Sequence, residues 1–461
     1  MRHTRVLLIA VVSLAPVARA HSQTPATDTV RPLAADSVRP LAADSVRARP
    51  FGDSLRLGAL QDSAVMRDPR GRELALLTEQ SRLRQQNLSA ERRPTLTVEG
   101  QAQYQSDVAT IPITLPGGIS PPTPPHDTYD AHLAAGQTLY DPAIGPRRSV
   151  EDAQLAESQA RLRAALYPLR QNVADAFFAA LQAQSQIAEL QLAIMDLEAQ
   201  HRVAAARVRE GTALPSEEKA LRAELLRRRQ SLAETGGNRR AALAILADLT
   251  AKSYDSATIL GSTDLAAQVS RTRDSLSVLR ARPEYEQFAR SRSLLEQQER
   301  ARKAQDLPRL GAFGRAGYGR PGLNPLSTKF DSYWLAGVQL QWSPWTWGVG
   351  SRDRQILALQ RQIITAEEQQ FTDNLRRGTE QDIATIDRLA TSVRDDDEIV
   401  ALRESILTET RARFNEGVVT SADYVDRQTD VLSARTARAL HRVELAQARA
   451  RFLTTLGIEV R

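Results

Sequence analysis

Two carboxylates lie three residues apart just after a short turn in the C-terminal part of the chain. Asp423 and Asp426 follow Thr420-Ser-Ala in a stretch whose apolar spacing predicts a helix. Residues three apart share a helix face, so both carboxylates are presented on one side of the helix. One interpretation is structural: Thr420 or Ser421 caps the helix, and the helix dipole favours Asp423 in its first turn. This capping role is compatible with a further role for the two charges.

Motifs for catalysis, metals and cofactors are incomplete. Ser216-Glu-Glu-Lys219 matches the S-x-x-K of penicillin-binding enzymes, but the S-D-N and K-T-G motifs are missing. The glycine-rich run 311–319 alternates like a strand and lacks the G-K-[ST] of a phosphate loop. There is no cysteine, and the six histidines are scattered; His201 is interpreted as a polar helix-seam residue. We therefore predict no enzyme, no metal site and no cofactor.

The turn before the carboxylates occurs twice. Ala206-Arg-Val-Arg-Glu-Gly211 recurs 206 residues later as Ala412-Arg-Phe-Asn-Glu-Gly417. Pro94-Thr-Leu-Thr-Val-Glu-Gly100 recurs 214 residues later, with Pro, Leu and Gly in the same places, from Pro308 to Gly314. Such self-similarity indicates a duplicated unit. The predicted copies span 56–250 and 283–457, separated by a linker or equatorial region over 251–282.

The N-terminal residues predict export. Arg2 and Arg5, the apolar run 6–15 and Ala18-Arg-Ala20 together form a secretory signal peptide over 1–20. No other apolar run is long enough for a transmembrane helix, which leaves alternating membrane strands possible. Export without cysteine favours a large envelope protein over a small disulfide-bonded one. Residues 21–55 contain a verbatim octapeptide repeat and predict a flexible low-complexity segment, interpreted as a tolerated linker expansion.

Four segments alternate between apolar and polar residues, as strands do when their two faces meet different surroundings. They cover about 94–106, 128–140, 309–319 and 331–342. Each is long enough to cross a bilayer when tilted. Aromatic residues gather at the segment ends, as in membrane-interface girdles; those assigned to the interface are Tyr140, Trp334, Trp342, Trp345 and Trp347. The alternative is the edge of a soluble sandwich.

Long helices follow the strands in both copies. Apolar residues spaced three and four apart predict coiled-coil seams. The predicted helices cover about 59–92, 147–209, 215–250, 352–415 and 421–456, with a further helix from 283. At about 1.5 Å per residue, the longest reach about 95 Å. The fold class is thus mainly α with β, internally duplicated, with coiled-coil hairpins and four candidate membrane strands.

Four strands require partners if they enter a membrane. The smallest membrane barrels have eight strands, and open edges are not tolerated in lipid. The strands of several chains must then be pooled: two chains would supply eight and three would supply twelve. A cyclic ring of chains satisfies strands and long helices alike.

Together these motifs resemble the TolC family of outer-membrane efflux proteins over nearly all of 56–457. The motifs are Gln137-Thr-Leu-Tyr-Asp-Pro142 and Leu340-Gln-Trp-Ser-Pro-Trp345 after strands, and the paired turns 207–214 and 413–423. The resemblance implies a homotrimer with a twelve-strand β-barrel in the outer-membrane lipid and a periplasmic α-helical tunnel. It implies the exit duct of a tripartite efflux pump or type I secretion system, with a periplasmic adaptor and an inner-membrane transporter as partners.

The resemblance also assigns site residues. The turns that would contact the adaptor are Gly211, Thr212, Ala213 and Leu214 in the first copy and Gly417, Val418, Val419 and Thr420 in the second. The resemblance implies a gate formed by a ring of aspartates, which falls on Asp423 and Asp426. Three copies would place six carboxylates around a narrow axis, where they attract cations. An acidic partner in the gate falls on Glu217, with Ser216 as the expected helix cap. A basic gate partner present in some members falls on Val419, so that closing ion pair is expected to be absent.

Alternatives and open questions remain at this level. A coiled-coil envelope scaffold without a channel is the competing function. Nucleic-acid binding is not expected, because the net charge of +6 is made of arginines interleaved with acidic residues. The acidic run 395–398 is interpreted either as a tunnel lining or as a solvated outer face. The transported substrate is not encoded in recognisable residues.

Overall fold

The computed structural model describes residues 55–109, 123–261, 264–273, 280–325 and 327–460. The chain divides into two units, Met1–Gly52 and Asp53–Arg461, and all described residues belong to the second. The predicted signal peptide, and all but Leu55 of the predicted low-complexity segment, lie outside the described residues. The described chain is mainly helical with one antiparallel sheet, as the sequence predicts.

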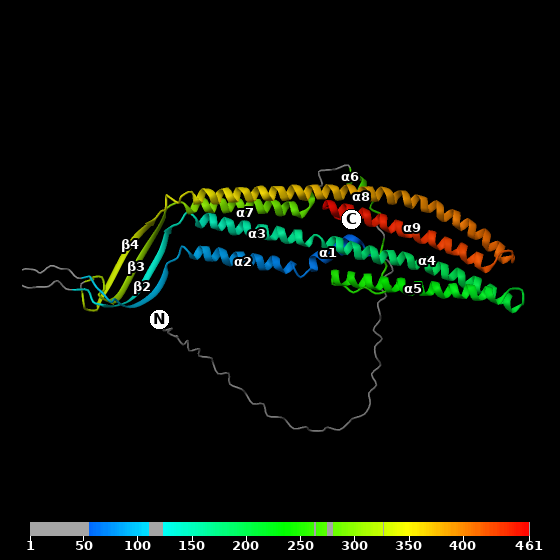
Figure 1. The fold of residues 1–461 in the computed structure, drawn as a ribbon, viewed down its shortest axis with the longest axis horizontal. Coiled ribbons are helices and arrows are strands. Elements are labelled where there is room, and N and C mark those ends of the chain that lie inside the picture. Colours follow the sequence, from blue (N-terminus) through cyan, green and yellow to red (C-terminus); the bar gives the residue numbers. More distant parts are fainter. Residues whose placement is uncertain (1–54, 110–122, 262–263, 274–279, 326, 461) are drawn as a thin grey trace, which may run out of the picture. The chain divides into compact units, whose positions relative to one another are not determined.

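The first half of the chain contains, in order, α1 (Leu57–Arg67), α2 (Gly71–Ala90), β1 (Thr95–Tyr104), β2 (Asp127–Tyr140), α3 (Ile144–Leu166), α4 (Leu169–Arg209) and α5 (Pro215–Thr250). The second half contains α6 (Ala266–Arg273), α7 (Pro283–Gln305), β3 (Arg309–Arg320), β4 (Asp331–Gln341), α8 (Val349–Asn415) and α9 (Ser421–Leu456). Each half therefore places a helix before two strands, and long helices joined by a tight turn after them (Figure 1).

The four strands form a single sheet in the order β1-β2-β3-β4. Its register aligns the apolar residues of all four strands: Val98 lies opposite Leu133, which lies opposite Ala316, which lies opposite Trp334. Because side chains alternate between faces, one face of the sheet is apolar across its whole width. The four separate alternations of the sequence thus combine into one surface.

The apolar face is solvent-exposed in the single chain, and the outer edges of the sheet are unpaired. Val98 on β1 is 83% exposed and no described helix covers it. Within the described residues, β1 and β4 each pair on one side only. Unpaired edges and an exposed apolar face are unfavourable in water, so this sheet is built to meet other surroundings.

Aromatic side chains gather at both ends of the sheet. At one end the Phe330 ring stacks on Tyr318 at 5.6 Å between centroids and lies 6.0 Å from Tyr129. At the other end the rings of Trp345 and Trp347 meet edge to face at 5.8 Å. All five residues assigned to the membrane interface are exposed in the chain, namely Tyr140, Trp334, Trp342, Trp345 and Trp347. Their interface role stays a prediction.

The helices lie side by side in two sets, joined by α8. Next to the sheet the neighbours are α2, α3, α7 and α8, in that order. Beyond them the neighbours are α5, α4, α9 and α8 (Figure 1). With 67 residues, α8 extends over about 100 Å and belongs to both sets.

Two helices that the sequence analysis treats as continuous are interrupted by proline. The prediction of one helix over 147–209 is wrong, because α3 ends at Leu166 and α4 begins after Pro168. Likewise the helix predicted over 59–92 is divided at Pro69 into α1 and α2. Proline lacks the N–H that would continue the hydrogen-bond ladder.

The main core lies where α4 and α9 meet α1, α5 and the chain that follows α5. Phe177 and Phe178 pack edge to face there, with Leu453 fully buried beside them. Gln184, a polar residue among the mainly apolar inward positions of α4, also belongs to this region. Its amide bonds both the N–H and the C=O of Leu260, at 3.1 Å each, and so attaches the segment after α5 to α4.

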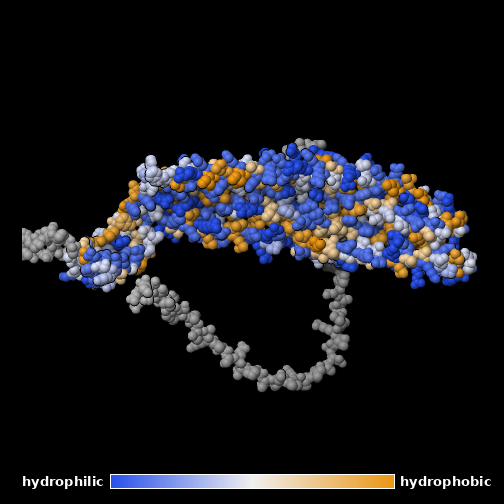
Figure 2. Space-filling view, in the orientation of Figure 1, coloured by the Kyte–Doolittle hydropathy of each residue, from blue (hydrophilic) through white to orange (hydrophobic). Residues whose placement is uncertain are grey.

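The apolar seam predicted for α8 is only partly buried. Ile386 is buried, whereas Ile356, Leu359 and Ile363, nearer the sheet, are each more than half exposed. Figure 2 shows apolar side chains at the surface over the first part of α8 and along the strands. Since α8 is an outermost helix of both sets, its unburied seam is a surface that lacks a neighbour in the single chain.

Candidate functional site

Both turns between the long helices have the same backbone construction. Gly211 and Gly417 adopt positive φ angles of 75° and 79°. After α4, the N–H groups of Gly211 and Thr212 bond the carbonyls of Val208 and Arg207; the equivalent bonds follow α8. This is the Schellman helix ending, which favours glycine at the left-handed position, and it explains why the Glu-Gly pair occurs in both copies.

The turns present a mixed surface. Gly211, Thr212, Gly417 and Thr420 are exposed, and the apolar Leu214 and Val418 are 66% and 70% exposed. Ala213 is half-buried, and Val419 packs against the core beneath the turns. The predicted adaptor-contact residues therefore lie at the ends of the long helices, and their contact with an adaptor stays a prediction.

The two return helices begin differently. Thr420 caps α9: its hydroxyl accepts the Asp423 N–H at 3.2 Å, and the Asp423 carboxylate accepts the Thr420 N–H at 3.0 Å. These bonds from Thr420 hold the pKa of Asp423 below its ordinary value, so the carboxylate stays ionised. At α5 the expected cap Ser216 is wrong, because Leu214 occupies the cap position and Pro215 begins the helix.

The three predicted gate carboxylates are not grouped in one cluster in the described part of the chain. Glu217 is half-buried in the first turn of α5. Asp423 is exposed and engaged by the cap of α9. Asp426 is exposed one turn further on, and makes no hydrogen bond or ion pair within the described part of the chain. The capping interpretation of Asp423 is confirmed, while the ring of carboxylates stays a prediction.

A core beneath the turns contains a polar network that the sequence analysis missed. Tyr424 is fully buried and its ring stacks on Phe414 at 5.3 Å. Its hydroxyl donates to Asp196 at 2.5 Å, and Arg411 bonds both Asp196 and the Tyr424 hydroxyl. Burial, together with the bond to Asp196, raises the pKa of the Tyr424 phenol, so it remains a donor. The network joins α4, α8 and α9.

The burial of Tyr424 could have been predicted from the sequence, but its polar partners could not. Tyr424, Gln428 and Val431 recur four and three residues apart and are all buried, which is the spacing of one helix face. Asp196 and Arg411 are 215 residues apart in the chain. No local pattern connects two residues at that separation.

Arg207 connects the two turns directly. Its guanidinium donates to the carbonyl of Phe414 at 3.0 Å and to that of Asn415, and lies 5.9 Å above the Phe414 ring. These carbonyls are at the C-terminal end of α8, where a cation is favourable. The end of α4 is thereby bonded to the end of α8.

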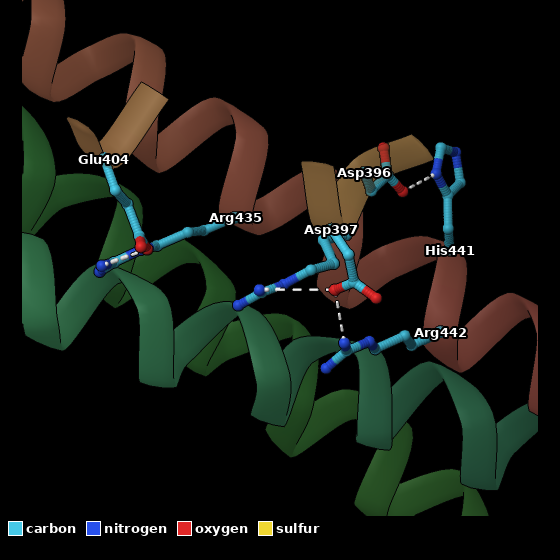
Figure 3. A network of polar contacts seen from close by, with 7 residues as sticks. Asp396, Asp397, Glu404, Arg435, His441 and Arg442 are labelled. Atoms are coloured by element: carbon cyan, nitrogen blue, oxygen red, sulfur yellow. Dashed lines mark hydrogen bonds and ion pairs between the residues drawn. The ribbon is translucent and has the colours of Figure 1, made fainter. Parts of the chain in front are cut away.

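The acidic run 395–398 contains one buried residue and three exposed ones. Asp396 is buried and bonded to His441 of α9, whereas Asp395, Asp397 and Glu398 are exposed, and Asp397 is bonded to Arg442 of α9. The predicted solvated face thus describes the three exposed residues but not Asp396, and the tunnel lining stays a prediction. Figure 3 shows these contacts between α8 and α9: Asp396 with His441 at 2.6 Å, Asp397 with Arg442 at 2.7 Å, and Glu404 with Arg435 at 2.7 Å. Such a ladder aligns the two helices that lead to the second turn.

The described residues contain neither a cluster of metal-ligating side chains nor a helix suited to cross a membrane. Among these residues, no three histidine, aspartate or glutamate side chains are grouped as metal ligands. No helix in the described part of the chain is both long and apolar enough to cross a membrane. His201 contacts Glu218 at 3.7 Å on the neighbouring helix.

The sheet with one apolar face, the two helical sets and the paired turns define the fold of the TolC-like outer-membrane channels. CusC, whose structures concern transmembrane channel formation, superposes with a TM-score of 0.64 at 16% identity, covering 88% of this chain and 93% of CusC. The outer-membrane channel CmeC of Campylobacter jejuni gives 0.61 at 14% identity, covering 94% of each chain.

The open-state outer-membrane channel MtrE of Neisseria gonorrhoeae is also similar. Its TM-score is 0.61 at 19% identity, covering 88% of this chain and 90% of MtrE. These proteins are described as channels rather than enzymes. No protein-family model and no curated protein sequence matches the chain. The likeness therefore establishes the fold.

Proposed function

We propose that this chain is one protomer of a passive duct through the outer membrane of a Gram-negative cell. The observation that carries the proposal is the register of the sheet, which places the apolar residues of four strands on one exposed face. Lipid is the surrounding that such a face favours. Trp334 and Trp342 are eight residues apart on β4 and its end, about 20 Å across a membrane for a strand tilted by about 40°.

The duct is a ring of three chains. The free edge of β4 would pair with β1 of the next chain, giving an antiparallel barrel of twelve strands without edges. The exposed seam of α8, with Ile356, Leu359 and Ile363, would pack against the outermost helices α2 and α5 of that chain, where Leu76 and Leu226 are exposed. The surface of β4 and α8 in one chain would thus contact the different surface of β1, α2 and α5 in the next chain. Such head-to-tail contacts generate a closed ring.

The duplicated halves supply equivalent parts of this ring. The copies, 56–250 and 283–457, each contribute two strands and one turn between long helices. The shared Schellman geometry of Gly211 and Gly417 supports the equivalence. Three chains would then present six turns at the periplasmic end, where a periplasmic adaptor docks and connects the duct to an inner-membrane transporter.

Conductance tests the duct directly. The full-length protein, extracted from outer membranes with detergent, is expected to migrate as a trimer on unboiled gels. It is also expected to produce discrete conductance steps in planar lipid bilayers. A water-soluble periplasmic species without conductance would instead support the coiled-coil scaffold. The fold is shared by both functions, so the membrane behaviour decides between them.

Asp426 is the cleaner probe of the proposed carboxylate ring, because Asp423 also caps α9. Asp426→Asn is expected to reduce the cation preference of the channel, since three charges leave a narrow axis. The reversal potential in a salt gradient measures this preference. Asp430→Asn, one turn further along α9 and paired with Arg403 at 2.9 Å, is the control. Equal selectivity in wild type and Asp426→Asn would refute the ring.

The turns should contact the adaptor. A photo-crosslinking amino acid at Val418, which is 70% exposed, is expected to attach to the adaptor encoded with this protein. The same amino acid at Met66, which is 79% exposed on α1 away from the turns, should not attach to it. Attachment from Met66 but not from Val418 would contradict docking at the turns.

A further inference from the structure

A polar row crosses the sheet on the face opposite the apolar one. Glu99 lies opposite His132, His132 opposite Gly317, and Gly317 opposite Tyr333, so all four strands contribute one residue at the same level. Asp130, two residues before His132 on β2, shares this face. The row is the one place in the described sheet where a histidine lies among carboxylates.

The histidine of the row is held between two carboxylates. Its side chain is 7% exposed, and Nδ1 lies 2.6 Å from Oδ2 of Asp130. Nε2 lies 3.3 Å from Oε2 of Glu99, but without hydrogen-bond alignment. A neutral imidazole donates from one nitrogen only, so bonding to Asp130 leaves a lone pair facing Glu99. A protonated ring can donate to both carboxylates.

Glycine on β3 makes room for this arrangement. A Cβ at Gly317 would lie 2.6 Å from Cβ of His132 and 2.9 Å from Cζ of Tyr333. The absence of a side chain therefore lets both residues lean over β3. The Tyr333 hydroxyl of β4 donates to Asp130 at 2.5 Å across β3, so this carboxylate is bonded both by His132 of its own strand and by Tyr333. The row is thus a packed and connected structure rather than a set of loose side chains.

We propose that His132 sets the charge selectivity of the barrel interior in a pH-dependent way. This inference rests on the proposed duct, in which the polar face lines the lumen. The charged groups of that face near the row are Glu99, Asp130, Arg315 and Asp331, from all four strands. Carboxylates and arginine ordinarily keep their charges between about pH 5 and 8, whereas histidine changes its charge there.

The direction in which the cation preference changes with pH follows from these charges. With His132 neutral, three carboxylates and one arginine leave a net negative lumen at this level. Protonation of His132 adds one positive charge per chain, or three per ring, and so makes the net charge of the lumen less negative. The cation preference of the channel is therefore expected to fall as the pH is lowered from about 8 to about 5. Asp423, at the start of α9 beside the second turn, does not produce this change, because its lowered pKa keeps it ionised over that range. We refer to the end of the helices that carries the two turns as the tip.

The experiment is the reversal potential of single channels of the full-length protein in a potassium chloride gradient, at both pH values. Wild type is expected to shift towards stronger cation preference at the higher pH. His132→Gln, which keeps a donor near Asp130, should conduct but lose the shift. His126→Gln, His201→Gln and His441→Gln are matched controls that should retain it.

A second variant keeps the proposal testable if His132→Gln does not assemble. Glu99→Gln removes a lumenal charge beside Nε2 and should weaken the cation preference at the higher pH. A wild-type channel without a pH shift, or a conducting His132→Gln channel with the full shift, overturns the inference while leaving the duct intact. Failure of the wild-type protein to conduct at all contradicts the proposed function itself.

Discussion

Replacing Val98 with arginine is expected to abolish assembly of the protein in the outer membrane. Val98 lies on the apolar face of β1, is 83% exposed in the single chain and aligns with Leu133 on β2. An arginine on the lipid face near the middle of a membrane barrel costs about 2–4 kcal/mol, and a ring of three chains incurs that cost three times. The amount of heat-sensitive trimer in outer-membrane fractions measures the effect.

Gln101→Arg is the matched control for this substitution. Gln101 is on the same strand, three residues away and on the opposite, polar face, where it aligns with Asp130. An arginine there faces the proposed wet lumen, so normal assembly is expected. The register predicts opposite outcomes for two residues of the same strand. Equal tolerance of Val98→Arg and Gln101→Arg would show that the apolar face does not meet lipid.

Replacing Tyr424 with phenylalanine is expected to increase the open probability of the channel. The substitution keeps the ring that stacks on Phe414 but removes the hydroxyl that donates to Asp196. A hydrogen bond to a charged group contributes about 1.5–3 kcal/mol. Because the network joins α4 to α8 and α9, separation of these helices would break it. Its loss should then favour the open state roughly 10- to 150-fold.

Single-channel recording at fixed voltage measures this effect. Tyr285→Phe is the control, since the Tyr285 hydroxyl also bonds a side chain, Thr372 at 3.0 Å, but in the helices next to the sheet. That variant should leave the open probability unchanged. Arg411→Leu, which removes the other donor to Asp196, should act in the same direction as Tyr424→Phe. Wild-type gating in both tip variants would exclude the network as a contact that holds the channel closed.

Helices and strands with strong local signals were predictable from the sequence. The return helices α5 and α9 match their predicted ranges, because proline or threonine begins them and the apolar spacing runs unbroken between. The four strands begin and end within two residues of the prediction. The break at Pro168 was also visible in the sequence, since a proline in the interior of a predicted helix interrupts it. The apolar seam continues across Pro168 and concealed the break.

The contacts at the tip were not predictable in the same way. Arg207 stands in the repeated turn motif, but its bonds to the end of α8 depend on how two helices from different copies lie together. The Asp196–Arg411–Tyr424 network brings together three helices, and its members have no common spacing. The local sequence pattern predicts which helix positions are buried. Long-range packing decides which side chain each buried polar group will bond.

The helical seams, the strand alternation and the glycine turns could be predicted without a structure, because each depends on residues within a few positions of one another. The duplication could be recognised because two stretches of the sequence repeat the same motifs in the same order. The register of the sheet, in contrast, depends on the tertiary structure. A shift by one residue between neighbouring strands would place Val98 on the face of His132 and divide the apolar surface. The pairing of β2 with β3, whose paired residues are 170 or more positions apart in the sequence, sets which side chains share a face. Both the lipid-facing surface and the polar row on the opposite face follow from that pairing.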